Sequence, residues 1–161
     1  LGAALPIDAL EDLSVLDQMA LKMGIPRLFE VSDWVDVRLS EGENGRFLFV
    51  NNYQDDPIET AIWQEGQVLF GGHAVRVGAR RGLILPLEWQ LEDGLILHYL
   101  TTEVTEVRRG VDEIVLQTEP PRFVAELSLP PGWQVEGFME RQGDLRRLRL
   151  RGEGEVRLRR V

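Results

Sequence analysis

The sequence predicts a mainly β fold, either an antiparallel β-sandwich or two small β lobes, with a short N-terminal helix. Apolar and polar residues alternate with period two from residue 34 onward, beginning with Trp34-Val35-Asp36-Val37-Arg38-Leu39, and this spacing is typical of half-buried strands. Runs of Gly, Pro and Asn separate such stretches at intervals of about 8 to 12 residues, as in sandwiches and barrels. Nothing after residue 30 has helical spacing, which excludes a βαβ sheet.

One helix is expected, over about residues 9–23. Gly24 suits the position that follows a helix, and Pro26 prevents a further turn. Residues 1–6, before the helix, are expected to form the end of a buried strand or a loop. The expected packed face of the helix consists of residues at helical spacing: Leu13, Leu16, Ala20 and Met23.

Several strands are expected in a first β lobe, residues 31–100. Asn44-Gly45 predicts a hairpin turn, because both residues tolerate positive φ. Pro86 inside an apolar run indicates a strand end or an edge strand. The expected strands are 34–39, 46–50, 58–63, 67–70, 74–77, 83–87 and 95–100, and the expected core residues are Phe47, Phe49, Leu83, Leu85, Leu95 and Leu97.

Residues 101–161 are expected to form a second β lobe with a sharper alternation. Pro120-Pro121 and Gly152-Glu153-Gly154 are expected to be turns between strands. No flexible linker precedes residue 101, so the two lobes should share a packed interface. The expected strands are 101–108, 113–118, 123–129, 133–139, 145–151 and 155–160, with the core residues Val115, Leu127, Leu129, Leu148 and Leu150.

Composition excludes several classes of protein. The chain has 161 residues and a formal net charge of −9, so a nucleic-acid partner is not expected. No apolar run is long enough for a membrane helix. The absence of cysteine removes disulfides, thiolate metal sites and cysteine nucleophiles. It leaves the redox compartment open, with the cytoplasm as the favoured location.

The two histidines do not indicate a metal site. His73 follows two glycines and is expected in an exposed loop, whereas His98 is expected to be half-buried with one hydrogen-bonded nitrogen. No phosphate-binding loop or zinc motif accompanies them. We therefore expect neither a metal nor a cofactor.

The basic residues gather near the C-terminus. Residues 121–161 carry 9 basic and 6 acidic residues, whereas residues 1–60 carry 4 and 12. Alternation places Arg147, Arg149 and Arg151 on one strand face, and Arg157 and Arg159 on another. Such a face is suited to anions or nucleic acid, but the acidity of the whole chain favours ion pairs with the acidic N-terminal half or a neighbouring domain.

No motif singles out catalytic carboxylates. Glycosidase chemistry needs two carboxyl groups about 5–5.5 Å or about 6.5–9.5 Å apart, and the candidates are Glu88, Glu92, Glu103 and Glu106. Acidic residues on the solvated face of strands are expected in so acidic a chain. Neither a Ser-His-Asp order nor a nucleophile elbow is recognised.

The aromatic residues allow two interpretations. Exposed rings stack on sugars in lectin-like modules, whereas buried rings fill the core of small sandwiches, and the second role is the commoner one. The candidates for sugar stacking are Trp34, Tyr53, Trp63, Trp89 and Trp133.

Two stretches carry more specific information than the spacing of strands. They are Trp34 to Arg38 with Gly45 to Tyr53, and Arg80 to Leu87. They resemble the C-terminal β region of bacterial β-galactosidases of glycoside hydrolase families 42 and 35. In those enzymes an extended segment precedes an FLFVNNYQ-type strand, here Phe47 to Gln54, and an RGLILPL segment closes the first β unit. Residues 1–30 resemble the last strand and helix of the α/β middle domain of family 42, which is associated with subunit assembly.

The resemblance implies a non-catalytic accessory β-sandwich region that packs on the catalytic part of such an enzyme and stabilises it. The catalytic glutamates of the family lie on a (β/α)₈ barrel, which needs about 200 residues or more, so no catalytic residue is assigned here. The expected partners are that catalytic domain, in the same polypeptide, and a second copy of the chain. The start at Leu1 fits part of a longer protein.

Two alternatives stay open. The first is a free-standing carbohydrate-binding module for a galactoside or another carbohydrate, which would use the exposed aromatic residues. The second is an enzyme in its own right, acting through carboxylates such as Glu88 or Glu103.

Overall fold

The computed structural model describes residues 22–23, 28–138, 140–144 and 147–161. Within them the fold is mainly β and antiparallel, as predicted. The expected helix over 9–23 lies outside the described residues except for Lys22 and Met23, and the Met23 side chain is 75% exposed. The segment 1–6 also lies outside them. Among the described residues there is no helix with the length and hydrophobicity needed to span a bilayer.

The described elements follow one another along the chain with short connections. Apart from one 3₁₀ turn, η1, all of them are strands. In order they are β1 (Phe29–Val31), β2 (Asp36–Gly42), β3 (Gly45–Asn51), β4 (Ile58–Thr60), β5 (Ile62–Gln64), β6 (Gln67–Val68), η1 (Phe70–Gly72), β7 (Val75–Val77), β8 (Gly82–Glu92), β9 (Leu95–Leu100), β10 (Val104–Arg109), β11 (Glu113–Ser128), β12 (Trp133–Glu136), β13 (Glu140–Asp144) and β14 (Arg147–Arg160).

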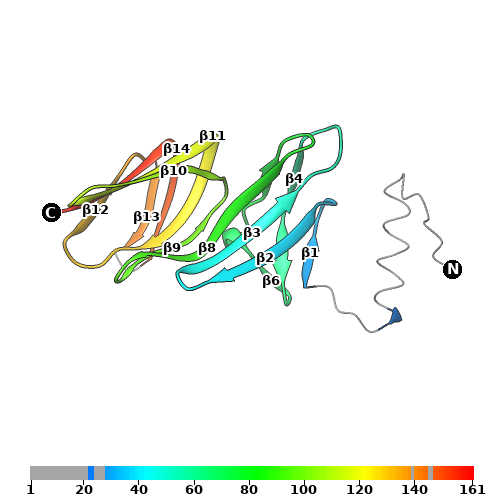
Figure 1. Cartoon of the computed structure of the whole chain (residues 1–161), viewed down its shortest axis with the longest axis horizontal. Coiled ribbons are helices and arrows are strands. Elements are labelled where there is room, and N and C mark those ends of the chain that lie inside the picture. The colour runs from blue at the N-terminus through cyan, green and yellow to red at the C-terminus, as the bar shows by residue number, and fades with distance from the viewer. Residues whose placement is uncertain (1–21, 24–27, 139, 145–146) are drawn as a thin grey trace.

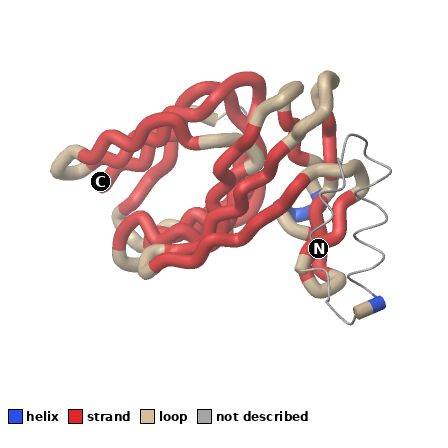
Figure 2. Tube along the Cα trace, turned by 45° about the vertical axis from the view of Figure 1, so that its right-hand side comes forward, coloured by secondary structure: helices blue, strands red, loops and turns tan. Residues whose placement is uncertain are grey.

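Most of these strands form one large antiparallel sheet (Figure 1), with the order β12-β14-β11-β9-β8-β3-β2 and with β10 and β13 paired to β11 and β14. The sheet curls strongly, so that its two ends wrap around separate interiors (Figure 2). Two small sheets, β1-β5-β6 and β4-β7, complete the first half of the fold. A hairpin joins β2 and β3 as expected, but its turn residues are Glu43 and Asn44, because Gly45 already pairs with Gly42 in the ladder, and of Asn44 and Gly45 only Gly45 has positive φ.

Two hydrophobic cores lie along the large sheet. The first contains Leu48, Leu85 and Tyr99, and the second contains Leu97 and Leu100 together with the inner faces of β11 and β14. Adjacent residues of β9 therefore belong to different cores. Both cores use the same sheet, and the expected boundary at residue 100 coincides with the end of β9, before β10 begins at Val104.

The expected core residues are buried with two exceptions. All five of the second lobe, and Leu83, Leu85, Leu95 and Leu97 of the first, are at most 6% exposed. The prediction was wrong for Phe47 and Phe49: Leu48 and Val50 are fully buried, whereas Phe49 is 37% exposed. Every residue of this run is apolar, so alternation alone does not distinguish its inner from its outer face.

Two expected turns lie instead within long strands. Pro120-Pro121 falls in a register shift of the β11–β14 ladder, between Gln117 and Arg122, where the missing N–H groups break no ladder bond. At the facing kink of β14, a Cβ on Gly152 would lie 2.5 Å from the Phe123 ring and 2.8 Å from the carbonyl oxygen of Gly137. The breakers in the sequence thus bend these two strands without ending them.

Candidate binding grooves between the two cores

Two open grooves lie where the elements of the first core meet those of the second. The first, of about 630 Å³, has β4, β7 and β8 on one side and β11 and the β14 kink on the other. The second, of about 610 Å³, is lined by residues of β3, β6, η1, β8, β9, β11, β13 and β14. We call them the Arg81 groove and the Tyr99 groove after a residue that lines each.

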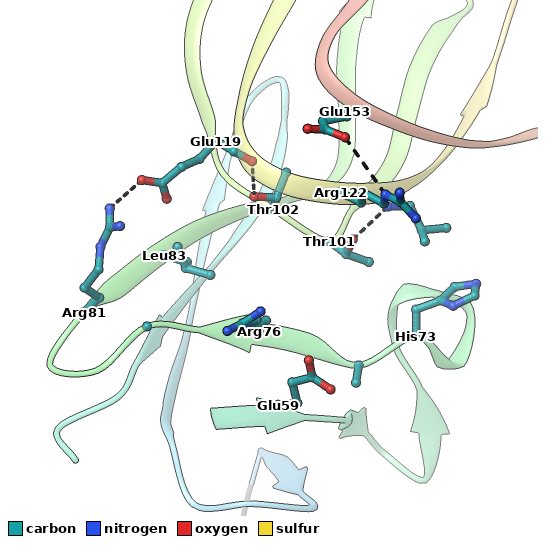
Figure 3. Close-up of a pocket in the computed structure, with 13 residues that line it drawn as sticks. Glu59, His73, Arg76, Arg81, Leu83, Thr101, Thr102, Glu119, Arg122 and Glu153 are labelled. Carbon is teal, nitrogen blue, oxygen red and sulfur yellow. Dashed lines mark hydrogen bonds and ion pairs between the residues drawn. The ribbon is translucent and has the colours of Figure 1, made fainter. Parts of the chain in front are cut away.

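The Arg81 groove is crossed by ion pairs (Figure 3). The guanidinium of Arg81 donates to Glu119 Oε1 at 2.7 Å, and Arg122 lies 4.0 Å from Glu153. The Thr102 hydroxyl donates to the carbonyl oxygen of Glu119 at 3.1 Å. Because Arg81 precedes β8 and Glu119 belongs to β11, this pair links elements of the two halves of the fold.

His73 lines the Arg81 groove and is half-buried. Burial, with a further contribution from the positive charges of Arg149 and Arg151, lowers the pKa of its imidazole below the ordinary value. Its Nε2 is buried and has no hydrogen-bond partner among the described residues. The side chain is therefore neutral near pH 7, and it is less exposed than the sequence predicted.

The floor of the Tyr99 groove contains a buried carboxylate clamped by two arginines. The Glu126 side chain is only 6% exposed and accepts hydrogen bonds from Arg147 Nε and, at 3.0 Å, from Arg149 Nη2. Burial acts to raise the pKa of this carboxyl, but the hydrogen bonds and charges of the two guanidinium groups outweigh it and lower the pKa. Glu126 is thus held in its ionised form.

Tyr99 lies beside this clamp with its hydroxyl buried. Its ring packs edge-on against Phe70, with the centroids 6.1 Å apart. Tyr99 Oη lies against the Arg149 guanidinium, but neither this oxygen nor Arg149 Nε makes a well-formed hydrogen bond to a described residue. Burial, followed by the negative charge of Glu126, raises the pKa of the phenol against a smaller opposing effect of Arg149. Two buried polar atoms therefore remain unsatisfied at one place, which is rare in folded proteins.

Gly71 covers the Tyr99 hydroxyl, and no other residue fits there. Its φ is +61°, in the left-handed region, and a Cβ at this position would lie 2.5 Å from Tyr99 Oη and 3.3 Å from Arg149 Nη2. Gly71 thus permits the close approach of η1 to β9 and β14.

A hydrogen-bonded chain of three side chains, Glu88, His98 and Ser128, runs across β8, β9 and β11. His98 Nδ1 lies 2.8 Å from Glu88 Oε2, and its Nε2 lies 2.7 Å from Ser128 Oγ. Both ring nitrogens are bonded, one more than the sequence predicted. Glu88 has a positive φ of +49°, and His98 lies opposite it in the β8–β9 ladder. On its other side, His98 lies where the register between β9 and β11 shifts, between Glu126 and Leu127.

The order carboxylate–imidazole–hydroxyl is that of hydrolase triads. Glu88 and His98 line the Tyr99 groove, but Ser128 is not among the described residues that line it. The arrangement therefore fixes the orientation of Glu88 and His98 at the groove. Sequence reasoning missed Ser128 because no motif surrounds it and only the strand register brings it to His98.

The five aromatic residues expected to stack on sugars are not gathered in one place. Trp133 is 6% exposed with Arg160 over its ring, and Trp89 is half-buried and packs edge-on against Phe47. Trp63 is half-buried in β5. Only Trp34 and Tyr53 lie together, with ring centroids 6.5 Å apart and planes at 45°, and Tyr53 is 62% exposed.

Of the remaining carboxylate candidates, Glu92 and Glu106 are held in ion pairs, whereas Glu103 contributes its backbone oxygen to a hydrogen bond from Glu119 N. Glu92 pairs with Arg160 at 3.0 Å, and Glu106 lies 3.8 Å from Arg108. Among the described residues, the arginine faces of β14 pair with acidic residues of β11, β13 and β14 itself: Arg151 with Glu140, Arg157 with Glu113 and Glu155, and Arg159 with Glu113. Among the described residues no group of three or more His, Asp or Glu side chains is placed to hold a metal ion.

No protein-family model matches the chain, and no curated protein matches its sequence. The function is therefore inferred from the residues, from their geometry and from the resemblance of two strands.

Proposed function

We propose that the chain is a non-catalytic β-sandwich region of a β-galactosidase-like glycoside hydrolase, which packs on the catalytic part and stabilises it. The observation that carries the proposal is a sheet with apolar residues on both faces. The two stretches that resemble the family are β3 with the residues that follow it, and β8 with the residues that precede it. These strands are hydrogen-bonded neighbours, with Phe47 opposite Pro86 and Phe49 opposite Ile84.

The inner face of these two strands is covered, whereas the outer face is only partly open, since Pro86 there is buried. Leu48, Val50 and Leu85 on the inner face are fully buried. On the outer face the cross-strand pair Phe49 and Ile84 is 37% and 42% exposed. Strands that are apolar on both sides are usually packed on both sides. A neighbouring domain that covers β3 and β8 explains why the outer positions are Phe and Ile.

Two experiments test this proposal. The first is to sequence the gene upstream of the codon for Leu1, where an in-frame barrel is expected, and an encoded protein without one would refute the proposal. The second introduces Phe49→Glu and Ile84→Glu into the full-length protein. We expect a lower melting temperature of the catalytic part, because a charge would be buried at the contact. Val111→Glu is the matched control, since Val111 is 93% exposed and lies in a loop.

Sugar binding is the second candidate, and the Trp34–Tyr53 pair is the observation that favours it. Two adjacent, partly exposed rings offer apolar faces on which a sugar ring can stack. Titration with galactosides and β-glucans should then change the tryptophan fluorescence, and Tyr53→Ala should abolish the change. A flat response to every sugar would eliminate this candidate.

A further inference from the structure

We propose that the Tyr99 groove binds a small carboxylate that also carries hydroxyl groups, such as a sugar acid. This inference does not depend on the proposed accessory role. It rests on the charges that line the groove, on the unsatisfied donors at its floor and on the acceptors fixed at its side.

The groove concentrates positive charge in an acidic protein. Arg46, Arg147 and Arg149 line it together with Glu88 and Glu126, whereas the whole chain has a formal net charge of −9. Glu126 is already neutralised by its two arginines. Arg46 forms no ion pair with any described residue, and its guanidinium has five N–H donors in a planar fork. That fork fits a carboxylate in two-point contact.

The floor of the groove has donors that the described residues do not use. Tyr99 Oη and Arg149 Nε are buried, and neither makes a well-formed hydrogen bond to a described residue, although the phenol lies against the Arg149 guanidinium. A buried donor without a well-formed hydrogen bond is unfavourable, and an oxygen acceptor that reached it would complete its hydrogen bonding. Gly71 keeps a methyl group out of this corner, since its Cβ would lie 2.5 Å from Tyr99 Oη. The corner thus combines donors with positive charge, which selects an anionic oxygen group.

The wall formed by β8 and β9 supplies acceptors. The Glu88 side chain is 48% exposed, and its carboxylate is oriented by His98, which Ser128 holds from the other side. A carboxylate accepts hydrogen bonds from hydroxyl groups but repels an anion. The groove therefore suits a ligand with an anionic end toward Arg46 and Arg149 and hydroxyls toward Glu88.

The test is isothermal titration calorimetry of the chain at low ionic strength with four probes: D-galacturonate, D-gluconate, D-galactose and acetate. We expect binding of galacturonate, gluconate or both, at least about tenfold tighter than that of galactose or acetate, because each of these lacks one half of the recognised chemistry. Tighter binding of galacturonate would indicate that the groove prefers a cyclic sugar acid, and tighter binding of gluconate would indicate an open-chain one. Equal binding of galactose, or no heat from either acid up to tens of millimolar, would overturn the proposal.

Variants that spare the Glu126 clamp complete the test. Arg46→Gln should weaken acid binding about tenfold, the loss of one charge-assisted contact, whereas Arg76→Gln in the Arg81 groove should not. Tyr99→Phe should weaken binding about three- to tenfold with little change in the melting temperature, because its hydroxyl makes no well-formed hydrogen bond to a described residue. Tyr53→Phe is its control. If Arg46→Gln and Tyr99→Phe bind as the unaltered chain does, the acids bind elsewhere and the proposal is wrong.

Discussion

Glu126 and Arg149 are joined by a hydrogen bond of 3.0 Å, although the glutamate is 6% exposed and the arginine 42% exposed. The pair connects β11 to β14 at the floor of a groove. The buried charge of Glu126 is thus balanced by a guanidinium group that is partly exposed. Replacing Glu126 should therefore change the stability of the fold measurably.

Glu126→Ala should destabilise the fold by about 2 to 3 kcal/mol, because a charged hydrogen-bond acceptor is lost and two guanidinium groups lose their counter-charge. Chemical denaturation followed by circular dichroism measures this. Glu140→Ala is the control, since the Glu140 side chain is 62% exposed and pairs with Arg151 only at 3.6 Å. A loss no larger than that of the control would show that the clamp adds nothing to stability.

Acid should weaken the fold through the same carboxyl. The pKa of Glu126 is lowered in the folded state, so its contribution is fully present above the unfolded value of about 4.3 and is lost as the pH falls through the folded value. Melting temperatures between pH 7 and pH 3 should therefore drop less steeply for Glu126→Gln than for the unaltered chain. Parallel curves would contradict this.

Gly71→Ala should cost about 1 to 2 kcal/mol or more, because φ is +61° and the new methyl would collide with Tyr99 Oη. Gly66→Ala separates the two causes, since Gly66 has φ +75° but no atom within 4 Å of its Cβ position. Combining Gly71→Ala with Tyr99→Phe should recover part of the loss. A double-mutant cycle without coupling would show that the collision has no energetic effect.

The two faces of the β3–β8 pair should respond differently to substitution in the isolated chain. Leu48→Ala should cost about 3 kcal/mol, because Leu48 is fully buried. Ile84→Thr should cost less than about 1 kcal/mol, because Ile84 is 42% exposed and Thr keeps the β-branched shape. Similar losses at both positions would mean that the outer face is already packed.

Gly152→Ala should destabilise the kink of β14 by about 2 kcal/mol or more, since the new methyl would press on the Phe123 ring and on the backbone of Gly137. Gly154→Ala, with open space around it but φ +79°, gives the cost of backbone strain alone. Urea unfolding of both variants distinguishes crowding from strain. A larger loss of stability for Gly154→Ala than for Gly152→Ala would contradict this prediction.

The β character of the chain could be predicted because period-two alternation and Asn-Gly turns are local signals. The inner face of β3 could not, because Phe47 to Val50 are all apolar and either set would fill a core. Pro120-Pro121 was misjudged for another reason: a proline ends a strand only where the ladder needs its N–H, and the register shift there does not. Alternation also predicted that Arg147 and Arg149 share one face of a strand, and both donate hydrogen bonds to Glu126.

The Tyr99 groove was beyond prediction because its residues come together only through long-range pairing. Glu88, His98 and Ser128 have no common motif, and their contact depends on how β8, β9 and β11 are aligned. The partner of the two arginines, Glu126, looked in the sequence like one more acidic residue. Its burial follows from its place in the central strand β11, between β9 and β14.

The division of β9 between the two cores has a consequence for how the molecule unfolds. Tyr99 packs in the first core and Leu100 in the second, so neither core can lose this strand without exposing the other. Such sharing makes the cores energetically interdependent, and they should melt in a single cooperative transition. A cut after residue 100 would therefore harm the second piece most, because Leu91, Leu95, Leu97 and Leu100 of its core would stay with the first piece.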